Sequence, residues 1–147
     1  MEAITFKVSR GFTYSYFHVT PSAESPKPYI LFLHGFPSIA LEWQHQIEHF
    51  RRLGFAVIAP DLLGYGGTSR PSDVSHYRFK HISNDMAEIL DHENVDAVYG
   101  VGHDMGAGLL ARMSFYFPYR FSKLAFLVTG YLPPGARFDI DTANTLS

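Results

Sequence analysis

The stretch GVGHDMGAG, residues 100–108, places an aspartate at the centre of a turn flanked by glycines. Gly102 and Gly106 stand two residues before and two after Asp104, between a stretch typical of a buried strand and one typical of a helix. A sharp strand-to-helix turn leaves no room for side chains at the glycine positions, and it pushes the central side chain outward, often with a strained backbone. We therefore expect Asp104 to be presented as a reactive group.

A carboxylate in this position can do chemistry that a serine cannot do unaided. With an ordinary pKa of about 3.9, Asp104 is an anion at neutral pH and needs no base to attack a saturated carbon that bears a leaving group. The product is an ester on the protein, which water must then cleave with the help of a base. The N–H of Met105 and one from the loop at Gly35–Phe36 would form an oxyanion hole for this second step. The pattern favours opening of epoxides or carbon–halogen bonds over ester hydrolysis.

The elements that position this turn are indicated by the spacing of apolar residues. The spacing predicts a hairpin over residues 4–16, buried strands over 29–33, 55–61, 96–102 and 123–130, and helices over 40–54, 79–93 and 105–117. This alternation predicts an α/β fold, with a mostly parallel sheet flanked by helices. Ligands bind beyond the carboxyl ends of such strands, so His34–Pro37, Asp61 and Gly102–Gly106 should converge on one edge of the sheet.

The composition excludes several classes of protein. The 147 residues suit one domain, and a net charge of −2 without a basic stripe argues against a nucleic-acid partner. The absence of cysteine excludes a disulfide framework, a thiolate metal site and a cysteine nucleophile. The start of the chain lacks the apolar core of a signal peptide, and no apolar run is long enough to span a bilayer. We therefore expect a cytoplasmic protein with no membrane span.

Two other kinds of site fit the sequence less well. The glycines from Gly100 to Gly106 are spaced GxGxxxG rather than GxGxxG, and Asp104 would repel a pyrophosphate, which argues against a dinucleotide site. His45 and His49 have the i, i+4 spacing of metal ligands, but no third ligand accompanies them, which favours a solvated helix face. The sequence therefore predicts neither a metal nor a cofactor.

Three motifs together resemble the α/β-hydrolase superfamily: HGFP at 34–37, DLLGYGGTSRP at 61–71 and GHDMGA at 102–107. In that superfamily the glycine-flanked turn is called the nucleophile elbow, and its aspartate form combined with HGFP is most similar to soluble epoxide hydrolases. The resemblance covers nearly the whole chain. It implies a hydrolase that acts through a covalent aspartyl ester on a small apolar electrophilic substrate.

The resemblance also implies roles for individual residues. Asp104 would be the nucleophile, and Phe36 and Met105 would supply the N–H groups of the oxyanion hole. The motif residues with structural roles would be His34, Gly35, Pro37, Asp61, Gly102 and Gly106. A cis peptide bond is expected before Pro37.

Met105 departs from several relatives of this kind. Epoxide hydrolases often carry tryptophan directly after the nucleophile, where this chain has Met105. Haloalkane dehalogenases have that tryptophan as well as an asparagine in the HGxP motif, and fluoroacetate dehalogenases usually carry arginine after the aspartate. Neither pattern is present, which favours the epoxide hydrolases.

The superfamily places its catalytic acid and histidine after the nucleophile, but the last histidine of this chain is His103. We therefore expect a truncated α/β-hydrolase fold that lacks the cap and the C-terminal strands, with residues 1–132 as the N-terminal half of the core and 133–147 as the start of the cap or a disordered tail. Such a chain would be inactive or incomplete by itself. The alternative is a non-catalytic fragment that binds an apolar ligand or a partner chain. In both cases the exposed strand KLAFLV, residues 123–128, invites association.

Overall fold

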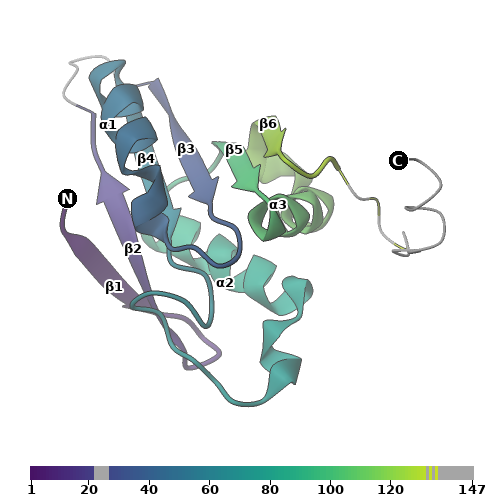
Figure 1. The fold of residues 1–147 in the computed structure, drawn as a ribbon. Helices are drawn as coiled ribbons and strands as arrows, with labels where there is room; N and C mark the ends of the chain where they lie inside the picture. The colour runs from purple at the N-terminus through teal and green to yellow at the C-terminus, as the bar shows by residue number, and fades with distance from the viewer. Residues whose placement is uncertain (22–26, 132, 134, 136–147) are drawn as a thin grey trace.

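Six strands form one sheet in the computed structural model, which describes residues 1–21, 27–131, 133 and 135. The strand order is β1-β2-β4-β3-β5-β6, as Figure 1 shows. The strands are β1 (Ala3–Lys7), β2 (Thr13–Val19), β3 (Lys27–Leu33), β4 (Phe55–Pro60), β5 (Val98–His103) and β6 (Phe121–Leu127). The helices are α1 (Gln44–Arg52), α2 (Phe79–His92) and α3 (Met105–Tyr116), with short 3₁₀ segments η1 (Ala40–Trp43), η2 (Val74–Tyr77) and η3 (Pro118–Arg120). Most of the expected cap segment, residues 133–147, lies outside the described residues.

The expected hairpin and the mostly parallel sheet are confirmed. β1 and β2 pair antiparallel, with Ile4 opposite Tyr16. β2 pairs antiparallel with β4, whereas the pairs β3–β4, β3–β5 and β5–β6 are parallel. β3 lies between β4 and β5, so the carboxyl ends of these three strands adjoin at one edge of the sheet.

The central strand β3 is buried on both faces because its side chains alternate between two cores. Leu31 and Leu33 pack with residues of α2 and α3, whereas Ile30 and Phe32 pack with Trp43 and α1 on the opposite face. β4 alternates in the same way. The unbroken apolar runs of both strands predict this burial.

The structure contradicts the buried strand expected over residues 123–130 and confirms the exposed edge strand expected over residues 123–128. β6 ends at Leu127, pairs with β5 alone among the described strands, and exposes most of its residues. Leu124 and Leu127 are 40% and 42% exposed. Although its sequence is as apolar as those of the central strands, β6 occupies an edge of the sheet, and an apolar run does not distinguish an edge strand from a central one.

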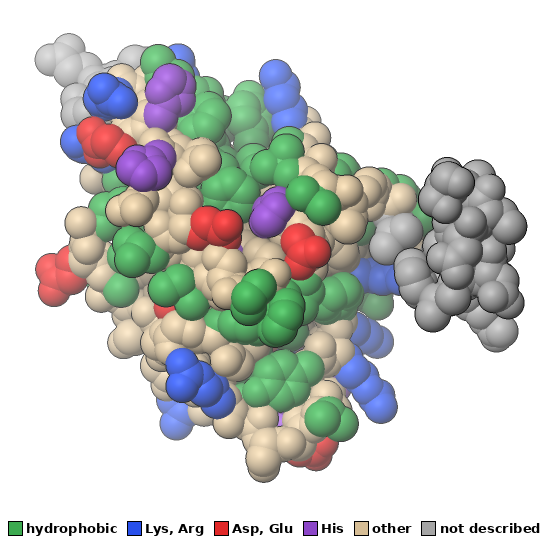
Figure 2. Space-filling model, viewed as in Figure 1, with side chains coloured by type: hydrophobic (Ala, Val, Ile, Leu, Met, Phe, Trp, Pro, Cys, Tyr) green, Lys and Arg blue, Asp and Glu red, His purple; other side chains and the backbone are tan. Residues whose placement is uncertain are grey.

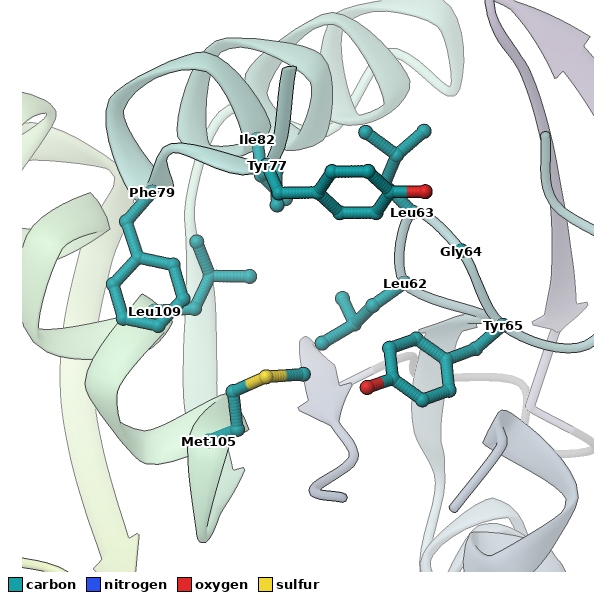
Figure 3. A pocket seen from close by; sticks show the side chains of 9 residues that line it. All are labelled: Leu62, Leu63, Gly64, Tyr65, Tyr77, Phe79, Ile82, Met105 and Leu109. Carbon is teal, nitrogen blue, oxygen red and sulfur yellow. The ribbon is translucent and has the colours of Figure 1, made fainter. Parts of the chain in front are cut away.

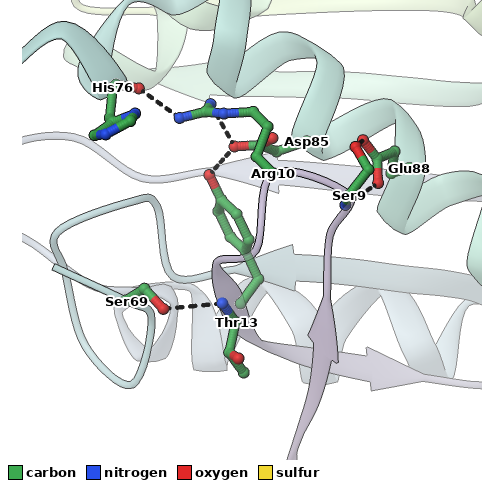
Figure 4. Close-up of polar contacts among 8 residues, drawn as sticks. Ser9, Arg10, Thr13, Ser69, His76, Asp85 and Glu88 are labelled. Atoms are coloured by element: carbon green, nitrogen blue, oxygen red, sulfur yellow. Dashed lines mark hydrogen bonds and ion pairs between the residues drawn. The ribbon is translucent and has the colours of Figure 1, made fainter. Parts of the chain in front are cut away.

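Polar contacts at the surface and in the core fasten the hairpin to α2. Asp85 of α2 is fully buried and accepts hydrogen bonds from the Tyr14 hydroxyl at 2.6 Å and from the Arg10 guanidinium at 2.9 Å. Figure 4 shows the Arg10–Asp85 pair beside a second contact, in which the N–H and hydroxyl of Ser9 both donate to Glu88. Burial raises the pKa of Tyr14, so its phenol stays protonated and donates to Asp85. These pairs join residues that are 71 to 79 positions apart.

Hydrophobic side chains occupy much of the centre of the face drawn in Figure 2, and Lys and Arg side chains lie scattered toward its rim. The exposed apolar residues of the molecule include Phe36, whose side chain is 67% exposed. None of the described helices combines the length and the apolar character that crossing a membrane requires.

Candidate active site

Asp104 lies in a sharp turn between β5 and α3. Its backbone has φ 51° and ψ −119°, a combination that L-amino acids rarely adopt and that costs about 1–3 kcal/mol. The turn brings glycines against main-chain atoms: a side chain at Gly102 would meet the Gly106 carbonyl oxygen at 2.6 Å, and one at Gly106 would meet that of His34 at 2.6 Å. The two flanking glycines are therefore required by close approach of the backbone.

The Asp104 carboxylate is held by a main-chain N–H from the loop after β3. The Phe36 N–H donates to Oδ1 of Asp104 over 3.0 Å, and the Phe36–Pro37 bond is cis, as expected. This hydrogen bond is the largest cause of a lowered pKa for Asp104, and the N–H of Met105 lowers that pKa further. The Met105 N–H lies beside the carboxylate without forming a well-aligned hydrogen bond to it. Asp104 is therefore anionic at neutral pH, with two main-chain N–H groups next to it.

The segment at the end of β6 also fixes Asp104, and no sequence motif predicted this contact. The Asp104 N–H donates to the Leu127 carbonyl oxygen, and the Thr129 hydroxyl donates to the Asp104 carbonyl oxygen, each over 3.1 Å. Gly35 packs on the other side, where a side chain would meet the Asp104 Cβ at 2.7 Å. The reactive residue is thus positioned from the ends of β3, β5 and β6.

His34 lies fully buried and bridges the ends of β3 and β4. Its Nδ1–H donates to the Gly35 carbonyl oxygen and its Nε2 accepts the Leu62 N–H, each over 2.9 Å. A ring nitrogen that accepts from an N–H is unprotonated, so the imidazole is neutral in this arrangement. Burial lowers the pKa of His34, although the bond to Gly35 and the charge of Asp61 act in the opposite direction.

We expect the buried, neutral His34 to make the fold less stable in mild acid. The pKa of His34 is lower in the folded chain than its ordinary value of 6.5, so the unfolded chain binds the extra proton below that pH. Above about pH 6.5 the protonation of His34 should leave the free energy of unfolding unchanged. Below that pH the free energy of unfolding should fall by up to about 1.4 kcal/mol per pH unit. Urea unfolding between pH 5 and 8 measures the slope. The His34→Gln variant, whose amide oxygen can still accept the Leu62 N–H, should show a smaller slope, and an unchanged slope would contradict the assignment.

Asp61 organises the loop after β4 through main-chain amides. Its Oδ1 accepts the N–H of Ala40 and its Oδ2 accepts the N–H of Gly67, each over 2.8 Å. The Thr68 hydroxyl donates to the Asp61 carbonyl oxygen over 2.7 Å. Both carboxylate oxygens are engaged by loop amides, which suits a structural role. The loops after β3, β4 and β5 therefore meet at one edge of the sheet, as the sequence predicts.

An apolar cavity of about 260 Å³, here called the side cavity, lies beside the elbow. Figure 3 shows the side chains of Met105 and Tyr65 facing each other at one end of it. The Tyr65 ring also packs edge-on against the rings of His34 and Phe36, at centroid distances of 5.3 and 6.5 Å. The side cavity is lined by Leu62, Leu63, Gly64, Tyr65, Tyr77, Phe79, Ile82, Met105 and Leu109.

The remaining histidines of interest do not gather into a site. His103 directly precedes Asp104, and its ring packs edge-on against Trp43 at a centroid distance of 6.4 Å. His45 and His49 both lie exposed on α1. Across the part of the chain that the structure describes, no three His, Asp or Glu side chains are placed to hold a metal ion.

Comparisons with known proteins agree with this geometry. Residues 28–145 match the alpha/beta hydrolase fold family. A curated relative, Epoxide hydrolase 2 of Siraitia grosvenorii, is 39% identical over 105 residues, which are 71% of this chain and 33% of that protein. This chain spans about a third of the length of such relatives.

Solved structures show the same likeness. A variant of a Vigna radiata epoxide hydrolase superposes with a TM-score of 0.85 at 32% identity, over 99% of this chain and 44% of that one. Epoxide Hydrolase A from Mycobacterium thermoresistibile gives a TM-score of 0.82 at 26% identity, over 99% of this chain and 45% of that one. The family match, these similarities and the strained aspartate turn together show that the chain belongs to the α/β-hydrolase fold family.

Proposed function

We propose that Asp104 is the nucleophile of an epoxide hydrolase, and that this chain performs the alkylation half of that reaction. The observation that carries the proposal is the hydrogen bond from the Phe36 N–H to Oδ1 of Asp104. It holds one carboxylate oxygen in place and leaves Oδ2 to attack. The epoxide hydrolases among the relatives support the substrate class.

The proposed step opens the epoxide by displacement at carbon. Oδ2 of Asp104 forms a bond to one ring carbon while the bond between that carbon and the ring oxygen breaks. The electron pair of the broken bond stays on the ring oxygen, which takes a proton from water and becomes a hydroxyl group, leaving hydroxide in solution. The product is a 2-hydroxyalkyl ester of Asp104, and its formation needs no protein base because the carboxylate is already ionised.

Cleavage of that ester is a separate requirement. Water attacks an ester efficiently only when a positioned base accepts its proton. This chain has no histidine C-terminal to Asp104, and the preceding His103 packs against Trp43. The ester should therefore accumulate on this chain instead of turning over.

Intact-mass spectrometry after incubation with styrene oxide tests the proposal. We expect one addition equal to the mass of the epoxide, located on Asp104 by peptide mapping, and no accumulating diol. The same incubation in unfolding concentrations of urea is the matched control and should give no selective addition, since the reactivity depends on the folded turn. Absence of the ester in the folded chain would contradict the proposal that Asp104 is the nucleophile. Many turnovers per chain would contradict the proposal that this chain lacks a base for ester cleavage.

We also infer that the exposed edge of β6 associates with another chain. Its apolar side chains and its place at one edge of the sheet that the described strands form favour strand pairing or aggregation. We expect light scattering to detect species larger than a monomer, and the Leu124→Lys variant to reduce them. Leu41→Lys, which changes a leucine of similar exposure away from the sheet edge, should have no such effect. A monodisperse wild-type monomer would contradict this inference, whereas association without ester formation would favour a non-catalytic binding role.

A further inference from the structure

We propose that Thr129 is a positioning residue for Asp104, whose hydroxyl fixes the peptide plane that carries the Met105 N–H. This inference rests on the proposed role of Asp104 as the nucleophile. The Thr129 hydroxyl donates to the Asp104 carbonyl oxygen over 3.1 Å. The peptide group between Asp104 and Met105 is planar and trans, so its N–H points opposite to that carbonyl. A bond that fixes the direction of the carbonyl therefore also fixes the direction of the Met105 N–H, which lies beside the carboxylate.

The segment at the end of β6 holds the backbone of Asp104 on both sides of its Cα. The Leu127 carbonyl oxygen accepts the Asp104 N–H and fixes the peptide plane before that Cα, whereas Thr129 fixes the plane after it. The N–H of Ala107 also donates to the Asp104 carbonyl oxygen, over 3.0 Å, but it belongs to the helix that Met105 begins. The rare combination of φ 51° and ψ −119° persists only where the surroundings hold it. Thr129 therefore supplies a restraint on this conformation from outside the helix.

Val128 lies between these two contacts in a left-handed backbone conformation. Its φ is 73°, which is unusual for a β-branched residue, and the residue is 81% exposed, so packing does not compensate for the strain. An extended Val128 would carry Thr129 about 7 Å beyond Leu127, whereas the left-handed bend lets both contact the same residue. The Tyr131 ring packs against the Phe126 ring at a centroid distance of 6.1 Å, so the chain folds back after the bend. The contact of Thr129 thus accounts for the strain at Val128.

Removing the Thr129 hydroxyl should slow the alkylation of Asp104, because the carboxylate is no longer held in line for attack. Thr129→Val keeps the shape of the side chain and loses the donor, so the ester of styrene oxide should form about fivefold to tenfold more slowly. Thr129→Ser keeps the hydroxyl and should restore the rate to within about twofold of the wild type. Thr5→Val makes the same change at an exposed position of β1 and should keep the wild-type rate. Intact-mass spectrometry over time measures these rates.

A second pair of variants tests the bend and leaves the hydroxyl in place. Proline cannot adopt φ 73°, so Val128→Pro should draw Thr129 away from Asp104 and slow ester formation at least as much as Thr129→Val does. Val74→Pro changes a valine of similar exposure at the first position of η2, where proline is tolerated, and should keep the wild-type rate.

A measurement that needs no reaction follows the direction of the Met105 N–H. The ¹⁵N–¹H residual dipolar coupling of Met105 reports this direction in the ¹⁵N-labelled chain. The coupling should change in Thr129→Val and match the wild type in Thr129→Ser. The coupling of Ile58, which is fully buried in β4, should stay the same in both variants.

The outcomes separate this inference from the proposed function. A changed Met105 coupling in Thr129→Val, with no ester formed by the wild type, would overturn the role of Asp104 and leave Thr129 as the residue that orients the peptide. An unchanged coupling, equal slowing by Thr129→Val and Thr129→Ser, or a wild-type rate in either Thr129→Val or Val128→Pro would overturn the inference about Thr129.

Discussion

Asp104→Gly should abolish ester formation and, at the same time, give a more stable fold than Asp104→Ala. Both variants lack the carboxylate, so the styrene oxide adduct should fall to background in each. They differ at the backbone: φ 51° with ψ −119° is strained for alanine and accessible to glycine. Because both variants also lose the hydrogen bond from Phe36, their difference reports the strain of the turn less the larger conformational entropy that glycine has in the unfolded chain.

We expect the free energy of unfolding of Asp104→Gly to exceed that of Asp104→Ala by about 1 kcal/mol or more, in urea titrations at one pH. Asp96→Ala removes an exposed acid outside the turn and should keep full ester formation. If Asp104→Ala still formed the adduct, another carboxylate would be the nucleophile. If Asp104→Gly were instead less stable than Asp104→Ala by about 0.5–1 kcal/mol, the ordinary difference between these residues, the turn would store no strain.

Gly106→Ala should destabilise the whole fold even though it adds a single methyl group. That methyl would lie against the main-chain carbonyls of Leu33 and His34, where no side-chain movement can make room. Overpacking against side chains costs about 1–3 kcal/mol, and we expect at least the upper value here because backbone atoms must separate. The urea concentration at the midpoint of unfolding should fall by about 1 M or more. Ester formation should also fall, because the turn that presents Asp104 is displaced.

Gly108→Ala provides the matched control within the same helix. Its methyl would meet only the Phe79 ring, at 3.1 Å, which a side chain can yield. Alanine also favours helix over glycine by about 1 kcal/mol, so the net change should stay within about 1 kcal/mol of the wild type. Equal destabilisation by the two substitutions would show that the tight contact at Gly106 is not what sets the cost.

Much of the site geometry could be predicted because it depends on local main-chain rules. The glycines at 102 and 106 predict a sharp turn, the turn predicts an aspartate with unusual backbone angles, and parallel strands predict that the HGFP loop reaches it. Each of these follows from a few neighbouring residues and the direction of strands in the sheet. The hydrogen bond from Phe36 agrees with these expectations. The cis bond before Pro37 agrees with what the resemblance to the α/β-hydrolase superfamily implies.

Other features depend on pairings between distant residues, which no local pattern encodes. The burial of a strand depends on its place in the sheet. The apolar run of β6 is equally typical of a central strand and of an edge strand. The Tyr14–Asp85 contact joins residues 71 positions apart, and neither position has an informative neighbourhood. The side cavity is the gap left between α2, α3 and the loop after β4, so its existence depends on how three side-chain surfaces fit together.

The contacts between the hairpin and Asp85 can form only after α2 has been synthesised on the ribosome. Tyr14 and Arg10 emerge early, but their partner lies 71 to 75 residues later. At translation rates of about 5–20 residues per second, about 4–15 s pass between synthesis of the first strands and synthesis of Asp85 in α2. During that interval the nascent hairpin presents its apolar side chains to the cell without their native partners. The hairpin is therefore synthesised before α2 but gains its native contacts to Asp85 only after α2 has emerged.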